Sequence, residues 1–131
     1  MAKKNQQATP RLLTETELEL MSILWRIRQG SVHDVMEGLS TGRTLAYTSV
    51  STILRILEQK KFVQSQKTGR GHTYSPLVPK DQYESSSVQH LVTKVFDGVP
   101  SSMVRRLLET SQLSEEELQS IRVLLAERSA E

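Results

Sequence analysis

Hydrophobic residues near the start of the chain recur every three to four positions, the period of an amphipathic α-helix. Thr14 and Glu17 stand just before this pattern with the spacing of an N-terminal capping box. We expect a helix that begins at Thr14 and stops at Gly30, with Trp25 packed in the core. Ser31 then caps a short second helix, whose end is bracketed by Gly38 and Gly42. The two predicted helices bury apolar positions at Leu18, Leu20, Met21, Ile23, Leu24, Ile27, Val32, Val35, Met36 and Leu39.

The segment 46–60 repeats the helical period, but its polar face is unusual. Small hydroxyl side chains crowd its first two turns, although Ser and Thr are mediocre helix formers. Such side chains let a helix lie close to a partner surface while they still offer hydrogen-bond donors and acceptors. The composition therefore indicates a contact surface, formed by Thr48, Ser49, Ser51, Thr52, Arg55 and Gln59.

Residues 62–77 have the pattern of a β-hairpin. Residues 62–66 alternate as a strand, residues 67–71 form a turn rich in glycine and positive charge, and residues 72–77 return as a second strand. Pro76 and Pro79 end this unit. We expect Lys67 and Arg70 to lie at a basic hairpin tip.

The helical pattern resumes at Asp81 and forms three amphipathic segments, separated by a break at residues 97–100 and by a capping box that opens at Ser114. So small a unit cannot bury all of its apolar stripes internally, and a second copy of the chain is the simplest partner to cover them. The predicted dimer interface consists of Leu91, Val95, Phe96, Leu107, Leu108, Ile121 and Leu125.

Composition limits the class of protein further. The chain has 131 residues, of which 37% are hydrophobic and 24% are charged, as in ordinary soluble folds. It contains no cysteine, which excludes disulfides and thiolate metal sites. No apolar run approaches the ~20 residues of a membrane span, and the polar first ten residues do not resemble a signal peptide. We expect a cytoplasmic protein with no membrane partner.

No group of residues has the spacing of a catalytic or metal site. His33, His72 and His90 lie on three different predicted elements without a helical i,i+4 spacing, so they do not form a metal site in sequence. The acidic run 115–117 is a first-turn charge preference of a helix. The sequence therefore predicts no enzyme, no catalytic residue, no metal and no cofactor.

The formal net charge of +2 conceals an asymmetry between the two parts of the chain. Residues 1–79 carry 11 Lys or Arg against 6 Asp or Glu, whereas residues 80–131 carry 6 against 9. Between Arg43 and His72 the single acid is Glu58. This asymmetry indicates that the first part contacts a polyanion.

A helix, a short helix, a hydroxyl-rich helix and a basic hairpin follow one another in the order of a winged helix-turn-helix. In that fold the third helix reads base edges in the major groove, and the wing neutralises phosphates. The sequence predicts double-stranded DNA as the partner, and a winged-helix module that binds proteins instead of DNA is the alternative. The predicted DNA-binding residues are Arg43, Tyr47, Thr48, Ser49, Ser51, Thr52, Arg55, Lys67 and Arg70.

Two of these assignments have structural alternatives. Arg55 is also placed to pair with Glu58 across one helical turn. Lys60 and Lys61 are equally consistent with a solvated helix end and with a phosphate contact.

The predicted fold is mainly α with a small β-hairpin wing: a winged helix-turn-helix plus a C-terminal helical dimerisation domain. We expect a flexible leader over residues 1–12, the winged-helix DNA-binding domain over residues 13–79 and the helical dimerisation domain over residues 80–131.

Three stretches resemble the BlaI/MecI/CopY family of penicillinase repressors, and the resemblance extends from Leu13 to Glu127. They are residues 17–25 (ELELMSILW), 45–54 (LAYTSVSTIL) and 74–78 (YSPLV). The resemblance implies a dimeric transcriptional repressor that binds an inverted-repeat operator. It also implies that the C-terminal helices form the dimer interface. By position, the family's recognition helix meets DNA at Thr48, Ser49, Ser51, Thr52 and Arg55.

The chain departs from the family pattern in two places. Copper-sensing members end in paired cysteines, which are absent here, so that metal response is not expected. The β-lactamase repressors are cleaved at an Asn-Phe bond, and the corresponding stretch 107–113 contains no such pair. A signalling protease therefore stays an open partner, and the operator and the inducing signal are open as well.

Overall fold

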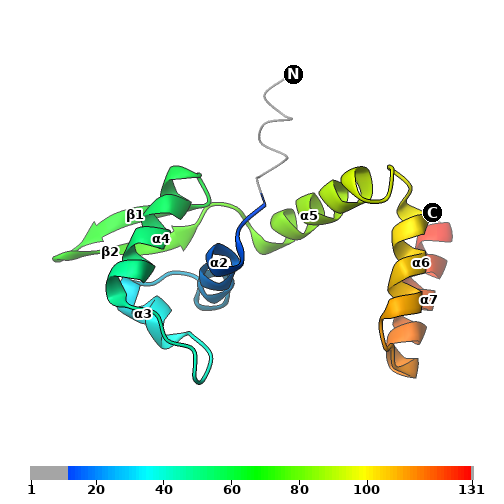
Figure 1. Cartoon of the computed structure of the whole chain (residues 1–131), viewed down its shortest axis with the longest axis horizontal. Coiled ribbons are helices and arrows are strands. Elements are labelled where there is room, and N and C mark those ends of the chain that lie inside the picture. The colour runs from blue at the N-terminus through cyan, green and yellow to red at the C-terminus, as the bar shows by residue number, and fades with distance from the viewer. Residues whose placement is uncertain (1–11, 131) are drawn as a thin grey trace, which may run out of the picture. The chain divides into compact units, whose positions relative to one another are not determined.

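The computed structural model describes residues 12–130, and they divide into two compact units between Val88 and Gln89. The element order is α2 (Glu15–Ile27), α3 (Val32–Glu37), α4 (Tyr47–Gln59), β1 (Val63–Thr68), β2 (Gly71–Pro76), α5 (Lys80–Lys94), α6 (Pro100–Thr110) and α7 (Glu115–Ser129). Figure 1 labels these elements. The expected flexible leader 1–12 lies outside the described residues except for Leu12. None of the helices within residues 12–130 is long and apolar enough to cross a bilayer.

The first unit packs α2, α3 and α4 against one another and against the base of a two-stranded antiparallel hairpin, whose tip extends beyond the helices in Figure 1. Its core is apolar and completely enclosed. The predicted apolar positions of the three helices supply most of it. Fully buried side chains are Leu20, Met21, Leu24, Val35, Val50, Leu54, Leu57, Phe62 and Val63. The unit therefore has the predicted helix-turn-helix with a wing.

The predicted capping box at Thr14 forms, and Ser31, which was predicted as a simple N-cap, forms a full capping box as well. Thr14 accepts a hydrogen bond from the Glu17 N–H and Glu17 returns one to the Thr14 N–H, and Ser31 and Asp34 make the same reciprocal pair. Each box satisfies two backbone donors that the helix itself leaves without partners. These local bonds explain why the starts of α2 and α3 were predictable.

The predicted stop of the first helix at Gly30 was wrong. Helix α2 ends at Ile27, and Arg28 takes the positive φ of 80° that terminates it. Gly30 instead forms a β-bridge with Tyr74, with backbone N–O distances of 2.9 and 2.8 Å. A Cβ at Gly30 would lie 2.8 Å from the side chains of Asp34 and Ile27, so the close packing beside the bridge requires glycine.

The hairpin is longer than predicted, and its turn is shorter. Lys67 lies within β1 and pairs with His72, so only Gly69 and Arg70 form the turn. Gly69 has a φ of +60°, which a two-residue hairpin turn demands at this position and which glycine adopts without strain. Lys67 therefore has a fixed strand position instead of a place in a mobile loop.

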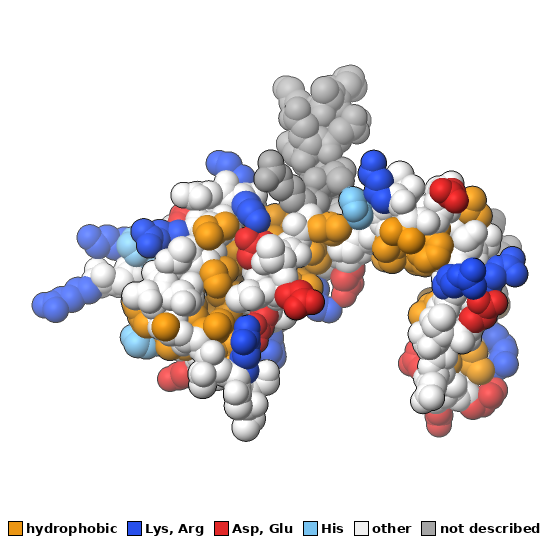
Figure 2. Space-filling view, viewed as in Figure 1, with side chains coloured by type: hydrophobic (Ala, Val, Ile, Leu, Met, Phe, Trp, Pro, Cys, Tyr) orange, Lys and Arg blue, Asp and Glu red, His pale blue; other side chains and the backbone are white. Residues whose placement is uncertain are grey.

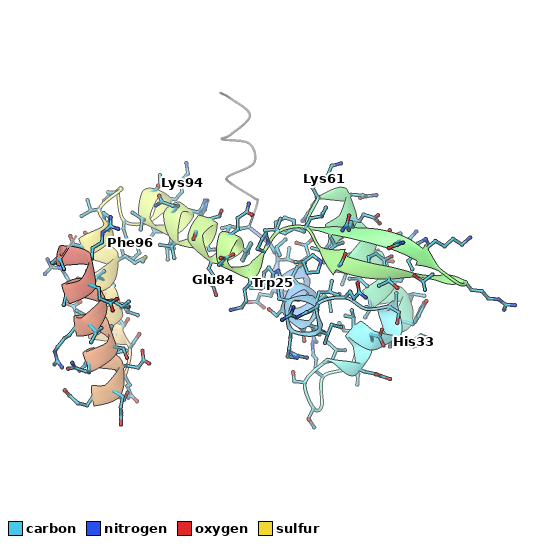
Figure 3. All side chains as sticks on the ribbon, turned by 180° about the vertical axis from the view of Figure 1, so that it is seen from behind. Trp25, His33, Lys61, Glu84, Lys94 and Phe96 are labelled. Carbon is cyan, nitrogen blue, oxygen red and sulfur yellow. The ribbon has the colours of Figure 1, made fainter. Side chains whose placement is uncertain are left out.

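The predicted boundary after Pro79 differs from the observed division, because the first half of α5 belongs to the first unit. Tyr83 of α5 is buried against Phe62 and Trp25, with ring centroids 6.1 and 5.8 Å away. Its hydroxyl also accepts a hydrogen bond from the Leu13 N–H. Trp25 donates through its indole N–H to the Val78 carbonyl and lies beside the start of α5 in Figure 3, as its predicted core role requires.

The second unit consists of the end of α5 with α6 and α7. Ser114 caps α7 by accepting from the Glu117 N–H, and Pro100 occupies the first turn of α6. Neither α6 nor α7 buries a single residue, and Val92 of α5 is the buried hydrophobic residue of this unit. Figure 2 shows hydrophobic side chains exposed around the end of α5. The three helices thus leave their apolar stripes uncovered.

Candidate nucleic-acid interface

Helix α4 has one buried face and one open polar face. Val50, Leu54 and Leu57 are fully buried, which fixes the rotation of the helix in the first unit. On the opposite face, residues spaced by four and three positions form a single exposed row: Thr48, Thr52 and Arg55. The row contains donors and acceptors short enough to approach a groove closely.

The other two predicted hydroxyl residues flank this row. Ser49 is exposed and joins Thr48 and Thr52 in lining a shallow open hollow on the helix surface. Ser51 is half-buried on the opposite flank, next to the core residue Val50. We therefore expect a weaker DNA contact from Ser51 than from Thr52.

Tyr47 opens α4 and is 47% exposed. Its ring lies against His33 of α3, with centroids 5.0 Å apart, so the two helices of the helix-turn-helix meet at this pair. His33 thereby limits the positions open to the Tyr47 side chain. The sequence offered no signal for this contact, because His33 lies on a different helix.

Arg43 is held by an acidic residue of α2. Its guanidinium makes hydrogen bonds of 3.0 to 3.2 Å to both carboxylate oxygens of Glu19. These hydrogen bonds, together with the negative charge of Glu19, raise the pKa of Arg43 above its ordinary value. The pair links the loop before α4 to α2, so Arg43 has a positioning role in addition to its predicted contact with DNA.

The alternative pairing of Arg55 with Glu58 does not form. Glu58 instead accepts a 2.7 Å hydrogen bond from the Ser65 hydroxyl of β1, while the Arg55 side chain stays exposed. Burial raises the pKa of Tyr74 on β2, and the nearby Glu58 carboxylate raises it further. The hydrogen bond between Ser65 and Glu58 joins the wing to α4. Arg55 stays available to a partner.

The basic residues of the wing lie where a phosphate backbone could reach them. Lys67 is the last but one paired residue of β1, and Arg70 lies in the turn; both are exposed. Figure 2 shows Lys or Arg side chains at the free end of the hairpin. The structure thus places an exposed polar helix and a basic hairpin in the same compact unit.

Sequence reasoning missed an ion pair that positions α4. The Lys60 ammonium lies 2.7 Å from the Glu17 carboxylate, whose side chain is 8% exposed. Burial alone would raise the pKa of Glu17, but the bonds from Lys60 and from the Thr14 backbone outweigh it and lower the pKa. Glu17 lies on the apolar face that contains Leu20 and Leu24, and an acid at such a position is the signal that could have revealed the pair. Lys60 is therefore neither a solvated helix end nor a free phosphate ligand.

Within residues 12–130, no three His, Asp or Glu side chains gather closely enough to hold a metal ion. His33, His72 and His90 lie on α3, β2 and α5, as the sequence predicted.

These features define the class: a winged helix-turn-helix with an exposed hydroxyl-rich third helix and a basic wing. The sequence model of the family described as penicillinase repressor matches residues 13–127. The chain belongs to the penicillinase repressor family, which is a family of transcriptional repressors.

Individual members of the family align with this chain over most of its length. The penicillinase repressor of Bacillus licheniformis is 28% identical over 115 residues, which cover 88% of this chain and 90% of that protein. The transcriptional regulator BlaI of Mycobacterium tuberculosis (strain CDC 1551 / Oshkosh) is 30% identical over 120 residues, covering 90% and 86%. The solution structure of Bacillus licheniformis BlaI, in its monomeric form with the blaP half-operator, is 25% identical with a TM-score of 0.48. That alignment covers 57% of this chain and 92% of the other.

Proposed function

We propose that this chain represses transcription by binding, as a homodimer, to an inverted-repeat operator. The observation that carries the proposal is the exposed row Thr48, Thr52 and Arg55 on a helix whose rotation is fixed by three buried residues. A rigid helix can insert such a row into the major groove, where hydroxyl and guanidinium groups hydrogen-bond to base edges. The basic wing then contacts phosphates on the adjacent backbone.

The homodimer is supported by the second unit. Helices α6 and α7 bury no residue of their own, and their exposed apolar side chains include Leu107, Leu108 and Leu125. Large apolar side chains that are exposed in such number usually mark an interface. A two-fold dimer presents two recognition helices to half-sites ~34 Å apart, about one turn of DNA. The second half-site contact then becomes intramolecular, which raises the affinity of the pair.

Binding to duplex DNA at increasing salt concentration tests this function. Each phosphate neutralised by the protein contributes about −0.9 to the slope of log K against log salt, so a repressor with several backbone contacts loses affinity steeply. Fluorescence anisotropy of a labelled mixed-sequence duplex measures this slope with the full chain. A winged-helix module that binds proteins alone would show neither binding nor a salt slope, and that result would overturn the proposal.

Footprinting on the DNA upstream of the protein's own coding sequence provides the specific site. We expect protection of two half-sites related by a two-fold axis. Binding to mixed-sequence DNA without any protected palindrome would support a DNA-binding protein but contradict a repressor of its own promoter region.

A further inference from the structure

One face of the hairpin is continuous with the surface that packs against α4. Ser65 and Tyr74 are cross-strand partners on this face: Ser65 donates to Glu58 of α4 over 2.7 Å, and Tyr74 is 4% exposed. Side chains alternate between the two faces of a strand, so the next residues on the same face are Lys67 on β1 and His72 on β2. The ring centroid of His72 lies 6.5 Å from that of Tyr74, as neighbours on one face require.

Lys67 and His72 are direct cross-strand partners and are both exposed. Partners in an antiparallel pair have Cβ atoms about 4.5–5.5 Å apart, so an ammonium group and an imidazole can reach the same ligand. The hairpin over residues 63–76 carries two cations, Lys67 and Arg70, and no Asp or Glu. Tyr74, the ring neighbour of His72, has Glu58, Arg55 and Tyr47 of α4 as its charged and titratable neighbours.

We propose that Lys67 and His72 together bind one phosphate of the DNA backbone, and that DNA binding therefore takes up a proton on His72. The inference rests on the proposed function and adds a DNA contact and a pH response to it. The protonated imidazole has two N–H donors and no acceptor, which suits a phosphate oxygen. Lysine supplies the permanent charge of the pair, and histidine supplies a charge that depends on pH.

The direction of the pH response follows from linkage. A phosphate next to an imidazole favours its protonated form, and histidine is the side chain whose charge changes between pH 5 and 8. Binding to DNA therefore becomes tighter as the pH falls from 8 to 6. One proton per histidine limits the effect to about tenfold per pH unit for each wing.

The test measures binding of the full chain to a labelled mixed-sequence duplex at pH 6 and pH 8, each over a range of salt. Backbone contacts do not depend on sequence, so no operator is needed. We expect the wild-type protein to bind more tightly at pH 6, with a salt slope steeper by about one unit per wing than at pH 8. The variant His72→Gln should lose this difference between the two pH values.

Histidine-to-glutamine variants at the other two histidines test whether the proton is taken up by His72. His90→Gln carries the same change on α5, far in sequence from the wing, and should keep the full pH response. His33→Gln removes the ring that contacts Tyr47 and should also keep it. Lys67→Gln should reduce the salt slope by about one unit per wing at both pH values. All four positions are exposed, and equal thermal unfolding midpoints verify that each variant is folded.

Three outcomes would overturn the inference. His72→Gln could retain the pH response, His33→Gln could abolish it, or Lys67→Gln could leave the salt slope unchanged. In each case binding would still depend on salt, so the proposed function would stand. Absence of any salt-dependent binding by the wild type at both pH values would instead refute the proposed function itself.

Discussion

The ion pair between Glu17 and Lys60 connects helix α2 to the end of helix α4. Glu17 caps the start of α2 and binds Lys60 at the end of α4, so one carboxylate serves both helices. Its position among buried leucines means that removal of Lys60 would leave a nearly buried charge without its strongest partner. Arg43 and Glu19 make a second link between α2 and the residues before α4, but at the exposed surface. The two pairs differ in burial and therefore in their expected contribution to stability.

Replacing Lys60 by Met should lower the free energy of unfolding by about 1–2 kcal/mol at pH 7. This is less than the ~3–5 kcal/mol of a fully buried pair, because Lys60 is 26% exposed. Since the pKa of Glu17 is lowered, its stabilisation is present above the ordinary glutamate pKa and is lost as the pH falls through the lowered value. The difference between the two proteins should therefore shrink below about pH 4. Urea unfolding followed by Trp25 fluorescence at pH 7 and at low pH measures it.

Lys80→Met is the control for this experiment. Lys80 also pairs with a glutamate, Glu84, but both side chains are more than half exposed. Its replacement should change stability by less than about 0.5 kcal/mol at either pH. A Lys60→Met protein as stable as the control at pH 7 would show that the Glu17 pair contributes nothing.

Helix α4 and the hairpin are proposed to make two different kinds of contact with DNA. In the proposed function, the open row of α4 distinguishes one base edge from another, whereas the charges of the wing act on any phosphate. Both elements are fixed to the same core, through Leu54 of α4 and through Tyr74 of β2. A variant in either element should therefore change DNA binding without unfolding the unit.

Thr52→Ala and Arg55→Ala should each weaken operator binding by about 1–3 kcal/mol and weaken binding to random duplexes much less. Arg70→Ala should weaken both by the same amount and reduce the salt slope by about one unit. Titrations of the footprinted operator and of a scrambled duplex measure these changes, with Lys94→Ala on α5 as a control that should alter neither. Equal losses on both duplexes for Thr52→Ala and Arg55→Ala would remove those residues from the base-reading set.

The described residues form one unit with an enclosed hydrophobic core and a second unit without such a core. The first unit buries a complete set of side chains, and Tyr83 of α5 completes it. The second unit exposes most of its large hydrophobic residues, which is unfavourable in water unless a partner covers them. In the proposed dimer, association of two copies is therefore coupled to the stability of the second unit as well as to DNA binding.

Replacing Leu107 and Leu125 together by Glu should convert the full chain from dimer to monomer, because two charges per copy cannot enter an apolar interface without partners. Operator affinity should then fall by about two to four orders of magnitude, since the second half-site contact is no longer intramolecular. Sedimentation equilibrium and operator titration measure the two effects. Leu77→Glu is the matched control: it lies in the first unit, is similarly exposed and should leave the dimer intact. A double variant that stays dimeric would place the interface elsewhere.

Local patterns in the sequence were sufficient to predict the order of helices and strands and the class of protein. The capping boxes at Thr14 and Ser31, the apolar period of α4 and the glycine in the hairpin turn all involve residues a few positions apart. The interactions that form each element lie within that element or next to it, and so the pattern predicts them. The exposed row on α4 was predictable for the same reason, because the apolar positions of a helix define its opposite face.

Contacts between distant residues were decided by tertiary structure alone. Gly30 forms a bridge with Tyr74 instead of ending a helix, and Lys60 binds Glu17 instead of facing solvent. The burial of Tyr83 in the first unit moved the division of the chain into α5. Each of these partners is more than 40 positions away in sequence or depends on a shared core. No periodicity reports such proximity, because it arises only when the helices and the hairpin pack together.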